Sequence, residues 1–178
     1  MAKFETERLV LRPVSPADHD ALRTLVFDPQ VVAYLRYRLL KTEADFEQAF
    51  TDHFLADATT VFALETKADH QFVGFYEFHV TETTGILTYA LLQSAWGHGY
   101  VAEAGRALMG YAFNTLGLTH LEAHYAHLNP NSGRVMAKMG MREAGELHTK
   151  TLDNGQVVHV MKYVLDKGDW NRAQSQSA

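Results

Sequence analysis

The amino-acid sequence predicts a mixed α/β or α+β layer fold. One observation is that β-rich runs and amphipathic stretches follow one another in the order β-α-α-β-β-β-α-β-α-β-β, which is typical of a layered domain. Another is that 178 residues with a hydrophobic share of 47% are enough to fill one core. We therefore expect a single domain over residues 1–167 and a polar tail over residues 168–178.

The first third of the chain predicts one strand followed by helices. Phe4–Val14 alternates between apolar and polar residues and closes with a proline, as an opening strand would. Ser15–Asp18 combines an N-cap residue, a proline at the first helical position and an early acid, which predicts a helix start. Asp28–Leu39 reads as a second helical piece, and Thr42–Asp45 has the pattern of a capping box before a third.

Three phenylalanines, Phe46, Phe50 and Phe54, follow this capping box at a spacing of four residues. This spacing places them on one face of a helix. They could line a ligand groove, but we favour packing in the core.

The rest of the chain alternates between strands and helices. Strands are expected where β-branched and apolar runs lie between turn signals, and helices where apolar residues recur with a period near 3.6. The predicted strands are Thr59–Lys67, Gln71–Val80, Ile86–Leu92, His120–Ala126, Met141–His148 and Gln156–Leu165. One predicted helix follows Gly99 and ends at a cap at Gly117, and another spans Pro130–Met139.

The composition excludes several classes of function. The chain has no cysteine, which excludes disulfides, thiolate metal sites and a cysteine nucleophile. Its ten histidines fall in no metal-ligand spacing, so we expect no metal. No segment approaches ~20 consecutive apolar residues and the first residues lack a signal-peptide core, so we expect a soluble cytoplasmic protein without a membrane partner. A net charge of −5 disfavours a nucleic-acid partner.

A glycine-rich turn runs straight into the central helix. Gly97 and Gly99 lack a Cβ, so a ligand can approach their backbone, and the first N–H groups of the helix have no intrahelical partner. The helix dipole makes this end electropositive, which suits a pyrophosphate, although a plain tight turn is the alternative. Tyr100 and Val101 stand where a P-loop needs lysine and serine or threonine, and Ala102 fits the dinucleotide fingerprint only loosely.

Three segments resemble one family. The stretch Trp96–Ala104, WGHGYVAEA, resembles the signature of the GCN5-related N-acetyltransferase (GNAT) superfamily, in its ribosomal-protein N-terminal acetyltransferase branch. The stretch Asn129–Met141, NPNSGRVMAKMGM, is similar to a second family block, and Thr6–Pro13, TERLVLRP, is similar to the opening of that branch. Together, the resemblance covers nearly the whole chain.

This resemblance implies a fold and a co-substrate. The fold would be a mixed, mostly antiparallel central sheet of about seven strands with helices on both faces. Strands Ile86–Leu92 and His120–Ala126 would splay apart around the pantetheine of acetyl-CoA, and a backbone N–H near Leu91 would polarise the acetyl carbonyl. The residues implied in binding acetyl-CoA are Leu91, Leu92, Gly97, His98, Gly99, Tyr100, Val101, Ala102, Asn129, Ser132 and Lys138.

The expected reaction is direct transfer of an acetyl group to a primary amine. Many superfamily members use a tyrosine as the acid for the departing thiolate, but this chain has Met136 at that position. Ser132, one turn earlier, is the substitute that we favour, with a role as a helix cap as the alternative. Among the carboxylates and imidazoles on the strands, Glu77 is our choice of general base. Glu103 matches the family signature and could simply interact with the helix dipole.

Two alternatives and several acceptors stay open. Met136 and Val101 depart from the family pattern, which would suit a non-catalytic acyl-CoA-binding sensor or scaffold, and a nucleotide-binding protein could use the same glycine turn. The early helices, which wall the acceptor site in the family, carry no chemical signature. Protein N-termini, free amino acids, polyamines and other small amines are therefore all candidate acceptors, and an exposed strand at Gln156–Leu165 would allow a homodimer.

Overall fold

The computed structural model describes residues 2–176, which form two compact units. The first unit contains the residues up to Phe78 together with Tyr89–Ala104, and the second contains His79–Thr88 together with the residues from Gly105 onward. No helix in the described part of the chain has both the length and the apolar composition needed to cross a membrane.

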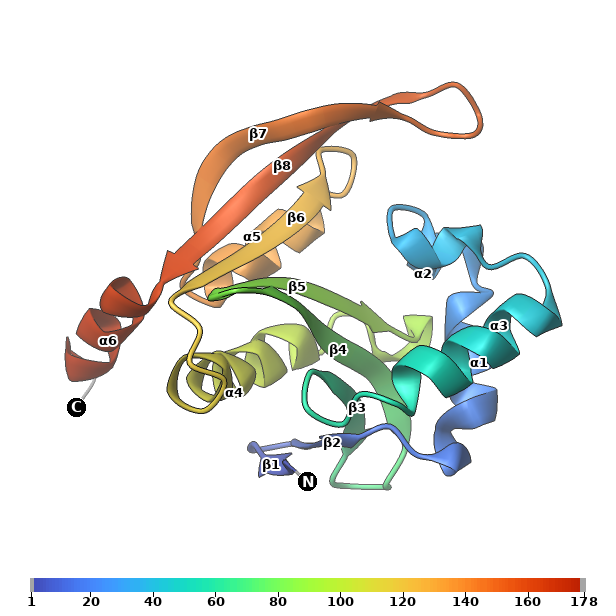
Figure 1. Ribbon diagram of the computed structural model, residues 1–178, viewed down its shortest axis with the longest axis horizontal. Helices are drawn as coiled ribbons and strands as arrows, with labels where there is room; N and C mark the ends of the chain where they lie inside the picture. The colour runs from blue at the N-terminus through green and yellow to red at the C-terminus, as the bar shows by residue number, and fades with distance from the viewer. Residues whose placement is uncertain (1, 177–178) are drawn as a thin grey trace. The chain divides into compact units, whose positions relative to one another are not determined.

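The described residues contain an eight-stranded, mostly antiparallel sheet, and the mixed α/β fold predicted from the sequence is confirmed (Figure 1). The strands are β1 Phe4–Glu5, β2 Leu9–Pro13, β3 Val61–Thr66, β4 Phe72–Thr81, β5 Thr84–Leu91, β6 His120–Ala126, β7 Arg142–Thr151 and β8 Val157–Asp166. Their order is β1-β2-β3-β4-β5-β6-β8-β7. The β5–β6 pair is parallel, with Thr84 opposite His120 and Leu87 opposite Ala123.

The opening strand is interrupted. Instead of one strand over Phe4–Val14, the chain forms β1 and β2, which pair antiparallel with Phe4 opposite Leu11. The interruption lies at Thr6, whose backbone N–H donates to the carbonyl of Leu9 at 2.9 Å and whose side-chain oxygen accepts from the Leu9 N–H at 3.0 Å. These local bonds close a turn, because a threonine side chain competes with the regular ladder for backbone partners.

The first unit carries a series of short helices after β2. They are η1 Pro16–Asp18, α1 His19–Val26, α2 Pro29–Val32, η2 Arg36–Leu39, α3 Glu43–Ala49 and the π-helical turn η3 Phe50–Phe54. The capping box is confirmed, because the Asp45 N–H donates to Thr42 Oγ1 and the Thr42 N–H donates to Asp45. The prediction of one continuous helical piece through Leu39 is wrong, because the chain is extended at Leu35. Leu39 itself is 60% exposed.

The phenylalanine stripe belongs to the core of the first unit, as expected. Phe46, Phe50 and Phe54 are all buried. The Phe54 ring lies 5.3 Å from the ring of Tyr37 and 5.2 Å from that of Phe75, between centroids. These aromatic contacts join the helices to the sheet within this unit.

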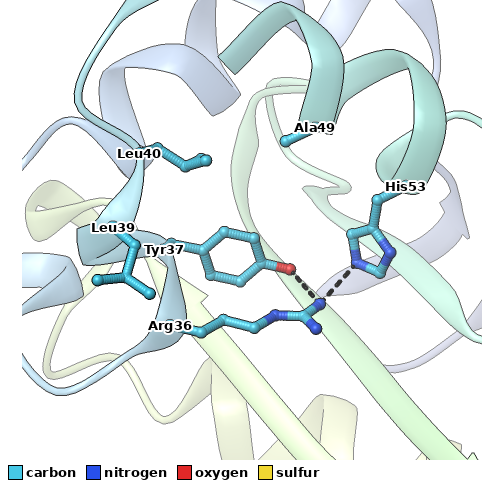
Figure 2. A pocket seen from close by; sticks show the side chains of 6 residues that line it. All are labelled: Arg36, Tyr37, Leu39, Leu40, Ala49 and His53. Atoms are coloured by element: carbon cyan, nitrogen blue, oxygen red, sulfur yellow. Dashed lines mark hydrogen bonds between the residues drawn. The ribbon is translucent and has the colours of Figure 1, made fainter. Parts of the chain in front are cut away.

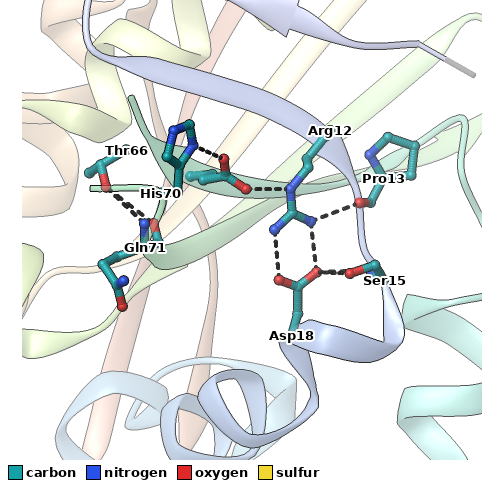
Figure 3. A network of polar contacts seen from close by, with 8 residues as sticks. Arg12, Pro13, Ser15, Asp18, Thr66, His70 and Gln71 are labelled. Atoms are coloured by element: carbon teal, nitrogen blue, oxygen red, sulfur yellow. Dashed lines mark hydrogen bonds and ion pairs between the residues drawn. The ribbon is translucent and has the colours of Figure 1, made fainter. Parts of the chain in front are cut away.

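An arginine on β2 also fixes the first helices to the sheet (Figure 3). The Arg12 guanidinium donates to both carboxylate oxygens of Asp18, at 2.7 and 2.8 Å, and to Glu65 at 2.7 Å. Asp18 also accepts from the backbone N–H of Ser15 at 2.8 Å. A buried carboxylate needs such partners to offset its lost hydration, and here it receives them.

The central helix α4, Tyr100–Asn114, begins directly after the glycine turn, as the sequence predicts. The second unit further contains α5 Pro130–Lys138 and α6 Lys167–Gln176. The sequence did not predict α6, where it indicated only a polar tail. Trp170 of α6 packs on Phe113, with ring centroids 5.5 Å apart.

The last two strands, β7 and β8, form a long hairpin (Figure 1). Its turn contains Gly155 with φ 80°, in agreement with the expected Asp-Asn-Gly turn. The strand expected at Gln156–Leu165 is β8, which is not an edge strand, because it is hydrogen-bonded to β6 as well as to β7. A homodimer cannot pair through the backbone edge of this strand.

Candidate active site

The glycine turn has the conformation that its residues predict. Gly97 and Gly99 both have φ 78°, in the left-handed region that favours glycine. The short helix η4, Gln93–Ala95, leads into the turn, and α4 starts at Tyr100. The turn therefore delivers the chain directly to a helix N-terminus.

The first N–H groups of α4 suit an anionic group. The Glu103 N–H donates to the Gly99 carbonyl at 3.2 Å, which closes the first helical turn. The N–H groups of Tyr100, Val101 and Ala102 precede this bond and have no partner within the helix. Oriented N–H groups at the positive end of a helix dipole bind phosphate oxygens well.

Arg8 adds a positive charge beside this turn. Its guanidinium lies 4.9 Å from the centre of the Tyr100 ring, and the Tyr100 ring in turn stacks on His98 with centroids 5.3 Å apart. A Cβ added to Gly99 would lie 3.7 Å from Nη2 of Arg8. The turn, the rings of His98 and Tyr100 and the Arg8 guanidinium thus lie together at the start of α4.

Glu103 holds Arg8 in this place. Glu103 Oε1 accepts from the Thr6 hydroxyl at 2.6 Å and from the Arg8 backbone N–H at 2.8 Å, while Oε2 accepts from Arg8 Nε at 2.7 Å. Burial raises the pKa of Glu103, but the hydrogen bonds from Thr6 and Arg8 outweigh burial and keep this pKa below its usual value. Glu103 therefore has specific partners beyond the helix dipole and ties the opening turn to α4.

The end of β5 leads into the glycine turn. The Trp96 indole N–H donates to the Leu91 carbonyl at 3.0 Å, and the Leu92 N–H donates to the Val73 carbonyl at 2.9 Å. The Leu92 N–H is therefore engaged in the sheet. A Cβ on Gly74 would lie 2.2 Å from the Ala90 carbonyl oxygen. The backbones of β4 and β5 therefore lie so close together here that only glycine fits at this position.

Glu77, the expected base, is the centre of a polar cluster on β4. Its side chain is only 5% exposed. Oε2 lies 2.7 Å from the Tyr37 hydroxyl and 2.7 Å from His53 Nε2, and both carboxylate oxygens accept from Nη2 of Arg36, at 3.1 and 3.2 Å. These three partners offset the cost of burying the carboxylate.

Within this cluster, His53 is the group best placed to exchange a proton with a ligand. Its side chain is 35% exposed, far more than that of Glu77. If Nε2 donates to Glu77, Nδ1 is the acceptor of a neutral imidazole. Burial raises the pKa of Tyr37, so its hydroxyl stays protonated and donates to Glu77.

A pocket opens beside this cluster (Figure 2). Its volume is ≈ 370 Å³, and it is lined by Arg36, Tyr37, Leu39, Leu40, Ala49 and His53. The family resemblance implies that the early helices wall the acceptor site, but the sequence does not single out Arg36, Tyr37 or His53. No local pattern marks these three side chains, because each gains its partner from β4, 24 to 41 residues away.

The second unit holds the other predicted site residues on α5. Asn129 is the N-cap residue of α5, and Ser132 is the third residue of the helix. Met136 is 1% exposed, so the position of the expected tyrosine is occupied by a buried apolar side chain. Lys138 is exposed at the end of the helix.

The remaining strand carboxylate that the sequence indicated, Glu122, serves an ion-pair network. It lies 3.2 Å from His120, 3.0 Å from His124 and 3.5 Å from Lys162. Across residues 2–176, no group of three or more histidine, cysteine, aspartate or glutamate side chains is arranged to hold a metal ion. These side chains therefore stabilise the β6–β8 pair.

The sheet order, the parallel β5–β6 pair and the glycine turn at a helix N-terminus define an acyltransferase class of fold and site. Residues 8–142 match the family model of the acetyltransferase (GNAT) domain, and the chain belongs to this family. The protein is thus an acetyltransferase, and the resemblance to the GNAT superfamily is confirmed.

Individual proteins agree with this assignment. The chain is 25% identical over 176 residues to the uncharacterized N-acetyltransferase p20 of Bacillus licheniformis, covering 96% of this chain and 99% of that protein. A GNAT-family acetyltransferase structure from Bacillus anthracis has a TM-score of 0.83 at 24% identity, covering 94% of this chain and 99% of that one. A spermidine N-acetyltransferase from Vibrio cholerae, solved with CoA and spermine, has a TM-score of 0.79 at 19% identity. The match covers 91% of this chain and 97% of that one.

Proposed function

We propose that the protein transfers an acetyl group from acetyl-CoA to a primary amine by direct nucleophilic attack. The observation that carries this proposal is the left-handed Gly97-x-Gly99 turn, which opens onto the unpaired N-terminal amides of α4. The match of residues 8–142 to the acetyltransferase family supports it, because this family transfers acetyl groups. We further propose that residues 1–167 act as one catalytic domain of the ribosomal-protein N-terminal acetyltransferase branch.

In this proposal, the amides from Gly97 to Ala102, which include His98, Tyr100 and Val101, hold the pyrophosphate of acetyl-CoA. The pantetheine of acetyl-CoA then lies along Leu91 and Leu92 at the end of β5. Since the Leu92 N–H is already bonded to Val73, Leu92 contributes contacts other than an amide donor. The resemblance to the family also assigns Asn129, Ser132 and Lys138, in the second unit, to acetyl-CoA binding.

The reaction forms one C–N bond and breaks one C–S bond. The neutral amine attacks the thioester carbon, whose oxygen receives the backbone N–H that we assign to Leu91. The amine proton passes to the Glu77 cluster, where His53 Nδ1 is the exposed acceptor and Glu77 orients the ring through Nε2. A hydrogen bond from the Ser132 hydroxyl stabilises the departing thiolate.

The acceptor is a small or protein-borne amine. The fold is similar to that of a spermidine N-acetyltransferase, and the sequence is similar to that of an uncharacterized N-acetyltransferase from Bacillus licheniformis, which supports an amine as the group that is acetylated. An α-amino group with a pKa of about 7.8 is neutral in roughly one molecule in seven at pH 7, whereas a lysine amine is neutral in roughly one in 2,500. Protein N-termini therefore demand less from the base than lysine side chains do.

A thiol-release assay tests the proposal. Acetyl-CoA and the purified protein are incubated with N-terminal peptides, amino acids and polyamines, and free CoA is measured. Release that depends on an amine, with N-acetyl product found by mass spectrometry, would support the transferase. Ser132→Ala should lower kcat more than it weakens acetyl-CoA binding, and unchanged turnover would remove the role of Ser132. CoA binding by calorimetry without release for any amine would refute the proposed reaction.

A further inference from the structure

The pocket beside Glu77 has an unusual distribution of charge, because all the hydrogen bonds of Arg36 to this cluster involve one nitrogen. Nη2 of Arg36 lies 2.9 Å from the Tyr37 hydroxyl, 3.0 Å from His53 Nε2 and within 3.2 Å of both oxygens of Glu77. Among the residues that the structure describes, Nε and Nη1 of Arg36 have no hydrogen-bond partner. The guanidinium carbon lies 5.0 Å from the centre of the Tyr37 ring, and these two nitrogens keep their N–H donors for a ligand.

The charge that this pocket presents to a ligand is positive. The Arg36 side chain is 54% exposed, whereas that of Glu77 is 5% exposed and accepts from three partners. An incoming group thus meets the arginine donors before it meets the carboxylate. A carboxylate satisfies such donors well, while a polyamine, which brings only positive charges, does not.

The remaining lining residues are apolar. Figure 2 shows Leu40 and Ala49 on one side of the Tyr37 ring and Arg36 on the other. Leu39 also lines the pocket and exposes 60% of its surface, a large share for a leucine. Covering this surface with an apolar group of a ligand is favourable, because it removes apolar area from water.

We propose that the acceptor is a free α-amino acid with an apolar side chain, its carboxylate bound by Arg36 and its side chain packed on Leu39, Leu40 and Ala49. This proposal rests on the proposed function. An α-amino acid carries amine and carboxylate on one carbon, so one small molecule can place its carboxylate on Nη1 or Nε of Arg36 and its amine beside the His53 ring, which lies next to the guanidinium with Nε2 3.0 Å from Nη2. The base and the carboxylate anchor are therefore close enough to hold both groups of one small molecule.

The first test compares leucine with molecules that lack one of its features. CoA release is measured with leucine, with leucinamide, which has no carboxylate, with glycine, which has no side chain, and with spermidine. We expect kcat/KM for leucine to exceed that for each of the other three at least tenfold. The amine of leucinamide is less basic and is more often neutral, so this preference for leucine would come from the carboxylate.

Two variants assign the preference to its residues. Arg36→Lys keeps a positive charge beside Glu77 but loses the second donor nitrogen, so the ratio of kcat/KM for leucine to that for leucinamide should fall at least tenfold. Leu39→Ala should raise KM for leucine several-fold and leave KM for glycine unchanged. Leu39 is exposed, so its replacement should leave the melting temperature near that of the wild type, which separates recognition from folding.

The outcomes separate this proposal from the proposed function. Equal or faster acetylation of leucinamide, peptide N-termini or spermidine would overturn the amino-acid assignment and leave the N-acetyltransferase in place. A leucine preference that survives unchanged in Arg36→Lys would overturn the role of Arg36. Absence of CoA release with every amine would overturn the proposed function, and the amino-acid assignment with it.

Discussion

Replacement of Glu103 by glutamine tests how the glycine turn is held in place. Glu103 joins the first turn of α4 to the opening turn of the chain, through the Thr6 hydroxyl at 2.6 Å and the Arg8 backbone N–H at 2.8 Å. Glutamine keeps the shape and an acceptor oxygen but removes the charge. We therefore expect Glu103→Gln to lower the stability of the fold and to weaken acetyl-CoA binding several-fold, because the start of α4 loses its anchor.

The magnitude follows from the two hydrogen bonds. Bonds to a charged acceptor contribute more than bonds to a neutral one, and losing this difference at Thr6 and at the Arg8 N–H costs about 1–2 kcal/mol. We assign none of this to the Arg8 guanidinium, because its side chain is 45% exposed and solvent screens the pair. For a protein of this size, the melting temperature should fall by roughly 2–8 °C.

The effect should depend on pH in a defined direction. The pKa of Glu103 is lower in the folded protein than the ordinary value of 4.5. A group with a lowered pKa stabilises the fold fully above its unfolded pKa, and this contribution is lost as the pH falls through the folded pKa. The stability difference between wild type and Glu103→Gln should therefore be complete at pH 7 and shrink below about pH 4.5.

Urea unfolding followed by tryptophan fluorescence measures this difference at pH 7 and near pH 4. Glu7→Gln is the matched control, because it makes the same change of charge next to Arg8 at an exposed position. The control should unfold as the wild type does. If Glu103→Gln unfolds at the same urea concentration as Glu7→Gln, or if its deficit is the same at both pH values, our account of the Glu103 contacts is refuted.

Three further substitutions test the site. Gly99→Ala should lower the free energy of unfolding by about 1–2 kcal/mol and weaken CoA binding, since φ is 78° at this position. The control Gly110→Ala, within α4, should leave CoA binding unchanged and leave the free energy of unfolding unchanged or raise it. Equal CoA affinities of the two variants in calorimetry would contradict this prediction. Gly74→Ala should destabilise the fold by at least 1–3 kcal/mol in urea unfolding, because its Cβ would lie 2.2 Å from the Ala90 carbonyl oxygen, and a stable variant would show that β5 can move. His53→Gln should lower kcat by roughly 100-fold with KM for acetyl-CoA unchanged, and an unaltered pH–rate profile would argue against proton transfer through this ring.

The sequence predicted those parts of the structure that depend on neighbouring residues. The turn at Gly97 and Gly99, the capping box at Thr42 and the buried face of Phe46 follow from backbone conformation, local hydrogen bonds and helical spacing. The interruption at Thr6 is also local, but the apolar alternation around it hid the competing hydrogen bonds. Local signals thus predict an element well when only one local structure satisfies them.

The cluster around Glu77 could not be predicted in the same way. The sequence indicated Glu77 as a polar residue on a strand, but its partners Arg36, Tyr37 and His53 come from η2 and η3, which reach β4 only through the tertiary fold. The same holds for the bond from Thr6 to Glu103, 97 residues along the chain. Such contacts can be predicted only when the strand order and the helix packing are known, and one sequence alone does not supply these.

The π-helical turn that carries His53 has an evolutionary consequence. A π-turn is equivalent to one residue inserted into an α-helix, and such insertions occur often at functional sites. Phe50 and Phe54 bracket this turn and are buried, so they fix its two ends in the aromatic core. Deletion of one codon between them would restore a regular helix and rotate a different side chain into the place of His53. This family member could therefore have gained or lost its proton acceptor in a single step, without rebuilding the surrounding core.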